Sequence, residues 1–213
     1  MLHVADAKSD ESINLELAVS TVCRATNTPP FVDCSPVEPL ASRTTIAFLV
    51  DEAAQGAVDL NGDGDADDDV LYLYDERSGQ ITATALAVAH GVGRDVSSYT
   101  FPITPALTDK LVVLLVSEAE SGGVDLNGDT DADDDVFYVI DLKTHTTANL
   151  ALAAATVVGP FGSRNPVASA LDGQKVILTV CEINQDADLN DDGDNDDEVT
   201  FVLHRDEVKI AKP

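Results

Sequence analysis

The chain has 213 residues, with 39 Asp plus Glu against 12 Lys plus Arg, which gives a formal net charge of −27. A surface this acidic, with no basic stripe, repels phosphates and argues against a nucleic-acid partner. Hydrophobic residues make up 44% of the chain, enough for a folded core, and no apolar run approaches the roughly 20 residues that span a membrane.

The N-terminal segment predicts one strand and one candidate disulfide. The first four residues lack the charged start and apolar core of a signal peptide, so an internal or truncated start is expected. Residues 12–20 predict a strand, because their Leu-Ala-Val sequence is matched later in the chain. Cys23 and Cys34 lie 11 residues apart in the next loop and are candidates for a disulfide, whereas Cys181 is expected in the core.

Three acidic segments belong to an internal repeat. Residues 59–69, 125–135 and 188–198 hold 6, 6 and 7 acids without one Lys or Arg, and the period is 66 residues and then 63. Such crowded carboxylates oppose compact folding unless cations neutralise them. One alternative is a halophile-style solvating surface, which would scatter acids over all exposed faces. The other is that the loops are solvated charge runs.

Each repeat unit reads as four short strands, and the acidic segment joins the second strand to the third. The third strand of the first copy is apolar on both faces, with Val70, Tyr72 and Tyr74 on one face and Leu71 and Leu73 on the other. Each small sheet is therefore expected to be covered above and below, as in a β-propeller. A β-sandwich with three decorated hairpins is the alternative.

The repeat divides the chain, residues 1–213, into three expected blades of a single all-β propeller unit. Unit 1 covers about 20–89, unit 2 covers 90–154 and unit 3 covers 155–213. The strand at 12–20 is a candidate to complete unit 3. Propellers typically have four to eight blades, so we expect two copies of the chain to form a six-bladed homodimer.

The acidic segments follow the pattern Asp-x-Asn-x-Asp-Gly-Asp-x-Asp. Oxygen ligands at positions 1, 3 and 5, a Gly at position 6 and a carbonyl at position 7 match the first half of an EF-hand calcium loop. Calcium accepts six to eight oxygen ligands in flexible geometry, which suits carboxylate-rich loops. The predicted Ca²⁺ ligands are Asp59, Asn61, Asp63, the Asp65 carbonyl and Asp67 in unit 1; Asp125, Asn127, Asp129, the Asp131 carbonyl and Asp133 in unit 2; and Asp188, Asn190, Asp192, the Asp194 carbonyl and Asp196 in unit 3.

Two departures from the EF-hand pattern leave the closing ligand open. Position 12, a bidentate Glu in EF-hands, is a valine in all three copies. Copy two also has Thr130 where the other copies have Gly, so its site is expected to be the weakest. The candidates for the closing ligand are Asp69, Asp135 and Glu198 beside the loops, and Glu52, Glu118 and Glu182 across the hairpins.

On these loops the chain, from about residue 34 to 204, resembles the calcium-binding β-propellers of bacterial extracellular proteins and, more loosely, integrin-type FG-GAP repeats. The resemblance implies a propeller fold with structural Ca²⁺ in each blade. Calcium loops of modest affinity need the millimolar calcium outside cells, so a secreted or periplasmic location is expected.

The long loops that enter each unit hold the candidate ligand residues. Arg24, Arg94 and Arg164 occupy equivalent loops and are candidates to bind an anionic small molecule, while His90 and Asp95 share the second loop. The expected function is a calcium-binding scaffold that presents a ligand or interaction surface. The alternative is a metal-dependent hydrolase of phosphoester, sulfate ester or carboxylic ester substrates, with His90, Arg94, Asp95 and Arg164 as candidate catalytic residues.

Overall fold

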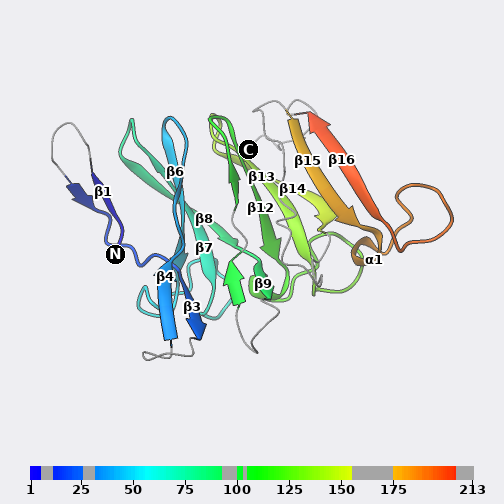
Figure 1. The fold of residues 1–213 in the computed structure, drawn as a ribbon, viewed down its shortest axis with the longest axis horizontal. Helices are drawn as coiled ribbons and strands as arrows, with labels where there is room; N and C mark the ends of the chain where they lie inside the picture. The colour runs from blue at the N-terminus through cyan, green and yellow to red at the C-terminus, as the bar shows by residue number, and fades with distance from the viewer. Residues whose placement is uncertain (6–11, 26–31, 93–99, 103–104, 155–174, 205–213) are drawn as a thin grey trace.

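The computed structural model describes residues 1–5, 12–25, 32–92, 100–102, 105–154 and 175–204, and these residues form an all-β structure (Figure 1). The all-β part of the predicted fold class is thereby confirmed. The strands are β1 (His3–Ala5), β2 (Ser12–Asn14), β3 (Thr21–Ala25), β4 (Val32–Pro36), β5 (Leu40–Ala41), β6 (Thr45–Asp51), β7 (Asp69–Asp75), β8 (Gln80–Ala87), β9 (His90–Val92), β10 (Thr100–Pro102), β11 (Ala106–Leu107), β12 (Leu111–Ser117), β13 (Asp135–Asp141), β14 (Thr146–Ala153), β15 (Lys175–Cys181) and β16 (Glu198–His204). Two single turns of helix follow β12 and β15, namely η1 (Ala119–Ser121) and α1 (Glu182–Gln185).

The strands pair antiparallel in two four-stranded and four two-stranded sheets. Units 1 and 2 each form a meander of the predicted kind, in the orders β5-β6-β7-β8 and β11-β12-β13-β14. The described part of unit 3 contributes the hairpin β15–β16. None of the described sheets closes on itself, and the propeller ring stays a prediction.

Apolar cores lie on both faces of the unit 1 sheet, as the sequence of β7 predicts. Val70, Tyr72 and Tyr74 pack in a core with N-terminal residues such as Leu15. The opposite face of β7 packs in a second core against the unit 2 sheet. A third core lies between the sheets of units 2 and 3, so the sheets are stacked face to face along the molecule (Figure 1).

Neighbouring units are also joined through the backbone. The end of each fourth strand crosses to the second strand of the next unit, where Val88 bridges Val116 and Ala154 bridges Val180. The N-terminal segment makes the equivalent bridge to unit 1 through Val19. Strand β2 pairs with β1, and closure of unit 3 by residues 12–20 is not found among the described strand pairs of the single chain.

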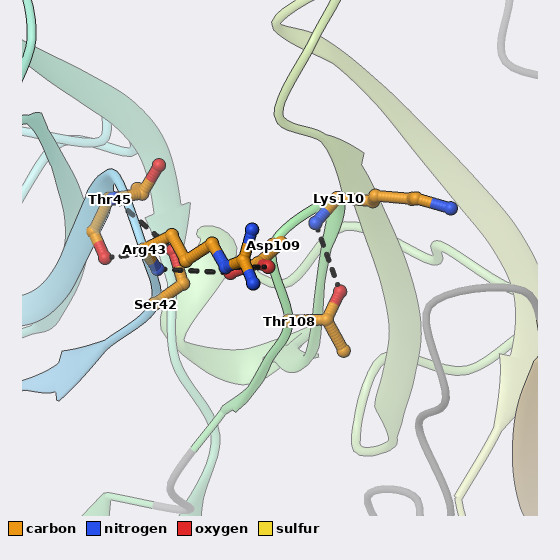
Figure 2. Close-up of polar contacts among 6 residues, drawn as sticks. All are labelled: Ser42, Arg43, Thr45, Thr108, Asp109 and Lys110. Atoms are coloured by element: carbon orange, nitrogen blue, oxygen red, sulfur yellow. Dashed lines mark hydrogen bonds and ion pairs between the residues drawn. The ribbon is translucent and has the colours of Figure 1, made fainter.

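An ion pair connects units 1 and 2 at the edge opposite the acidic loops. Figure 2 shows the β5–β6 turn reaching the β11–β12 turn, where Arg43 lies 3.3 Å from Asp109 and its backbone N–H donates to the same carboxylate. Both side chains are more than half exposed, so the pair adds little to stability.

The face of β15–β16 that points away from unit 2 carries both polar and apolar residues. Val176, Leu178 and Val180 are buried against unit 2, whereas Val202 is half exposed on the outward face. Cys181 is only partly buried at the end of β15, so it lies outside the core that was expected for it.

Candidate metal centres

The three acidic loops leave the sheets at the same edge of the stack, because β6, β12 and β15 all run toward that edge (Figure 1). Each loop begins after a glutamate and returns at an aspartate that faces it across the hairpin. The Glu52 N–H donates to the Asp68 carbonyl at 3.0 Å. The same backbone bond joins Glu118 to Asp134 at 2.9 Å and Glu182 to Asp197 at 3.0 Å.

The three glutamates are fully buried, with 0% of each residue exposed, and their carboxylates organise the loops. Glu52 Oε1 accepts hydrogen bonds from the Leu60 N–H at 2.5 Å and the Asn61 N–H at 3.3 Å, and Oε2 accepts from the Asp68 N–H at 3.3 Å. Glu118 and Glu182 make the equivalent bonds in units 2 and 3. These donors satisfy a charge that burial would otherwise disfavour.

The first aspartate of each loop holds the turn together. Asp59 accepts from the Gly62 and Gly64 N–H groups at 2.6 and 3.2 Å. Asp125 bonds Gly128 and Thr130 in the same way, and Asp188 bonds the equivalent part of unit 3. The residue at position 6 adopts a positive φ in each copy, at +112° for Gly64 and +92° for Thr130, which is unfavourable for a β-branched residue.

Three carboxylates converge in each unit, with ligand oxygens within 4.8 Å of one another. Each group combines the buried glutamate with the position-7 and position-10 aspartates of the loop, and each could hold a metal ion. The groups are Glu52, Asp65 and Asp68; Glu118, Asp131 and Asp134; and Glu182, Asp194 and Asp197. Two members are buried in the first and second groups and one in the third.

Two of the three position-10 aspartates, Asp68 and Asp134, have strongly raised pKa values. Burial, followed by the neighbouring carboxyl of Glu120, raises the pKa of Asp68 to about 9. Burial and the adjacent Asp129 raise the pKa of Asp134 to about 8. A hydrogen bond with Asp67 raises the pKa of Asp65. Without a cation, protons would be needed to relieve the repulsion in these groups.

The structure places the predicted ligands in different roles. Of the ligands predicted within the loops, Asp65, Asp131 and Asp194 lie in the three-carboxylate groups, through their side chains. The cross-hairpin candidates for the closing ligand, Glu52, Glu118 and Glu182, lie in the same groups. Asn61 Oδ1 accepts from the Asp63 N–H, while its Nδ2 donates to Asp68 Oδ2 at 2.7 Å. Asp63, Asp129 and Asp192 accept backbone N–H bonds from within their own loops, and Asp67, Asp133 and Asp196 are exposed.

The sequence prediction missed Asp68, Asp134 and Asp197. The strand register contains the signal for them. Val50 pairs with Val70 and Asp51 with Asp69, so one further step brings Glu52 opposite Asp68. In the other two copies the paired valines are Val116 with Val136 and Val180 with Val199, and the same two steps along the strands bring the glutamate opposite the position-10 aspartate.

Asp69 makes a separate contact that connects the N-terminal segment, unit 1 and β9. Ser20 Oγ donates to Asp69 Oδ1, and His90 Nε2 lies 3.0 Å from Asp69 Oδ2. Burial lowers the pKa of His90, but the hydrogen bond and charge of Asp69, with Glu120 and Asp135 nearby, outweigh burial and raise it. Burial raises the pKa of Asp135 to about 6, against the lowering effect of His90.

The candidate catalytic set is not brought together by the described residues. Arg94, Asp95 and Arg164 lie outside them. His90 is engaged with Asp69, and its side chain is 19% exposed. Arg24 lies in β3, where its backbone is opposite Asp33 in β4.

Comparison of the chain with protein-family models, with curated proteins and with solved structures gives no match. In the described part of the chain, neither helix has the length and apolar character that a bilayer crossing requires.

Proposed function

We propose that the protein is a calcium-binding scaffold in which one cation per acidic loop holds a stack of β-sheets together. The support comes from the chemistry of the three groups, which offer only carboxylate oxygens. Hard oxygen ligands suit Ca²⁺, whose usual six to eight ligands leave room for water and main-chain carbonyls beside three carboxylates.

The observation that carries this proposal is the buried, unpartnered carboxylate oxygen of Asp68. This residue is 2% exposed, and its Oδ1 has no hydrogen-bond partner among the described residues. A buried carboxylate oxygen is costly unless it meets a donor, a proton or a cation. Asp68 lies beside two further carboxylates that bring no donor when ionised, so a cation satisfies all three together.

A structural role follows from where the loops lie. Each group joins the end of one strand to the start of its hairpin partner, and loops 1 and 2 also contact the next unit. Neutralising the loops therefore favours both the hairpin and the packing of adjacent sheets. We propose a calcium-rich location, secreted or periplasmic, because loops of modest affinity are then filled.

The propeller and the homodimer are part of the same proposal. Face-to-face stacking of four-stranded meanders is the arrangement of propeller blades, and a second copy is a symmetric way to complete a ring. Light scattering of the calcium-loaded protein tests this part. The proposal requires a dimer at micromolar concentration, and a monomer would refute it.

The calcium sites are tested by a matched pair of neighbouring substitutions. Asp68→Asn removes a buried ligand of the first group, whereas Asp67→Asn removes an exposed carboxylate that lies outside it. Calcium titration of chelator-treated protein should show a loss of affinity of about tenfold or more at one site in Asp68→Asn, and a smaller loss in Asp67→Asn. Equal effects would contradict the assignment.

A further inference from the structure

The first acidic loop is packed closely against unit 2. Asn61 Nδ2 donates to the Glu120 carbonyl of η1 at 3.0 Å. Gly122 follows η1, and a Cβ there would lie 3.3 Å from both the Cβ and the carbonyl oxygen of Asp63. This close approach brings the turn of unit 2 to the carboxylates of loop 1.

The Glu120 side chain takes part in this contact. It is half buried on the turn that meets loop 1, and its carboxyl helps to raise the pKa of Asp68, after burial. Asp68 Oδ2 accepts from Asn61, which leaves Oδ1 without a partner among the described residues, and Asp63 Oδ2 is likewise buried and unpartnered. Neighbouring carboxylates of this kind repel one another unless a proton or a cation lies near them.

An open cavity gives access to this junction. Its volume is about 280 Å³, and it is lined by Asp63 on the side of loop 1 and by Ser121 and Gly122 on the side of unit 2. A hydrated ion can therefore approach the junction of the two units from solvent.

Among the described residues, no equivalent fourth carboxylate lies beside the other two loops. Asn184 is the residue of unit 3 that corresponds to Glu120, two positions after the buried glutamate, and its carbonyl accepts from Asn127 Nδ2 at 3.0 Å. Loop 2 thus meets a neutral residue. In loop 3, Asn190 Nδ2 bonds Asp192 and Asp197 of its own loop.

We infer that Glu120 of unit 2 is a ligand of the cation in the first site, which makes that site an inter-unit cross-link of four carboxylates. This inference rests on the proposed function and names the cation class as a hard divalent ion, with Ca²⁺ preferred over Mg²⁺ because the ligands come from a flexible loop. The four-carboxylate site is then the tightest of the three.

Calcium titration by calorimetry tests the inference on the full chain after chelator treatment. Glu120→Gln is close to isosteric, and Glu76→Gln in the exposed turn after β7 removes the same charge elsewhere. The expected result is a loss of affinity of about tenfold or more at the tightest site in Glu120→Gln, with the other two sites and the Glu76→Gln protein unchanged. Unchanged affinity at the tightest site in Glu120→Gln would overturn the inference.

A crystal structure of the calcium-bound wild-type protein gives a second readout that needs no variant. A Glu120 oxygen at about 2.3–2.6 Å from the first ion supports the inference, and an ion bound without Glu120 overturns it. If the wild-type protein takes up no calcium at all, the proposed function itself fails, and this outcome is distinct from uptake that ignores Glu120.

Discussion

The buried glutamate of unit 2 offers the sharpest test of how the loops are held. Glu118 is fully buried, and its carboxylate accepts three backbone N–H bonds, from Leu126 at 2.6 Å, Asn127 at 3.3 Å and Asp134 at 3.1 Å. In Glu118→Gln, an amide group replaces one oxygen and must face at least one of these buried donors. The variant loses a charge-assisted bond, leaves an N–H unpaired and weakens the remaining bonds.

The expected cost follows from those bonds. A hydrogen bond to a charged group contributes about 1.5–3 kcal/mol, and an unsatisfied buried donor costs about 1–3 kcal/mol. We therefore expect a loss of about 3 kcal/mol, which corresponds to a fall in Tm of about 6–12 °C for a domain of this size. The loss should be larger in calcium than in chelator, because the substitution also removes a proposed ligand.

Thermal unfolding followed by circular dichroism measures this effect in both conditions. Glu76→Gln is the matched control, because this exposed residue removes the same charge. The control should change the free energy of unfolding by no more than about 0.5 kcal/mol. If Glu118→Gln melts like this control in both buffers, the carboxylate does not organise the loop as described.

Four further predictions concern acidity, cysteine pairing and backbone strain. The raised pKa values of Asp68 (about 9) and Asp134 (about 8) contribute stability to the metal-free protein at low pH that is lost as pH rises through those values, so its Tm should fall from pH 6 to pH 9. Calcium binding at pH 7 should release about two protons, which calorimetry in buffers of different ionisation enthalpy measures. Binding without proton release would show that the two carboxyl groups are already ionised. Cys23 lies opposite Cys34 in the β3–β4 register, so peptide mapping of the oxidised protein should find them linked, and alkylation of both would contradict this. Thr130→Gly should raise Tm and the calcium affinity of the second site, since it removes a β-branched residue from φ +92°; lower values of both would show that strain is not the limit there.

Much of the fold was predictable because it depends on short-range patterns. The apolar residues on both faces of β7 predicted a sheet covered on both sides, and the structure has Tyr72 in one core and Leu71 in the next. The strands of the entry loops were harder to predict, because β3–β4 and β9–β10 are short hairpins with little alternation of apolar and polar residues.

The sequence predicted where the three carboxylate groups lie but not all of their members. The EF-hand template directs attention to alternate positions of the loop, and it therefore indicates Asp67 rather than Asp68. In this chain the loop closes a β-hairpin, so cross-strand pairing with Glu52 decides which aspartate is buried. The proposed contribution of Glu120 depends on the packing of two units, which no local sequence pattern contains.

The central claim is that each acidic loop holds a divalent cation. The most direct measurement is elemental analysis of protein that has been stripped with chelator and then dialysed to equilibrium against millimolar calcium, with the dialysis buffer as the blank. The account predicts three calcium ions per chain above the calcium of the buffer, in the presence of sodium and potassium. Protein that retains no calcium under these conditions would contradict it.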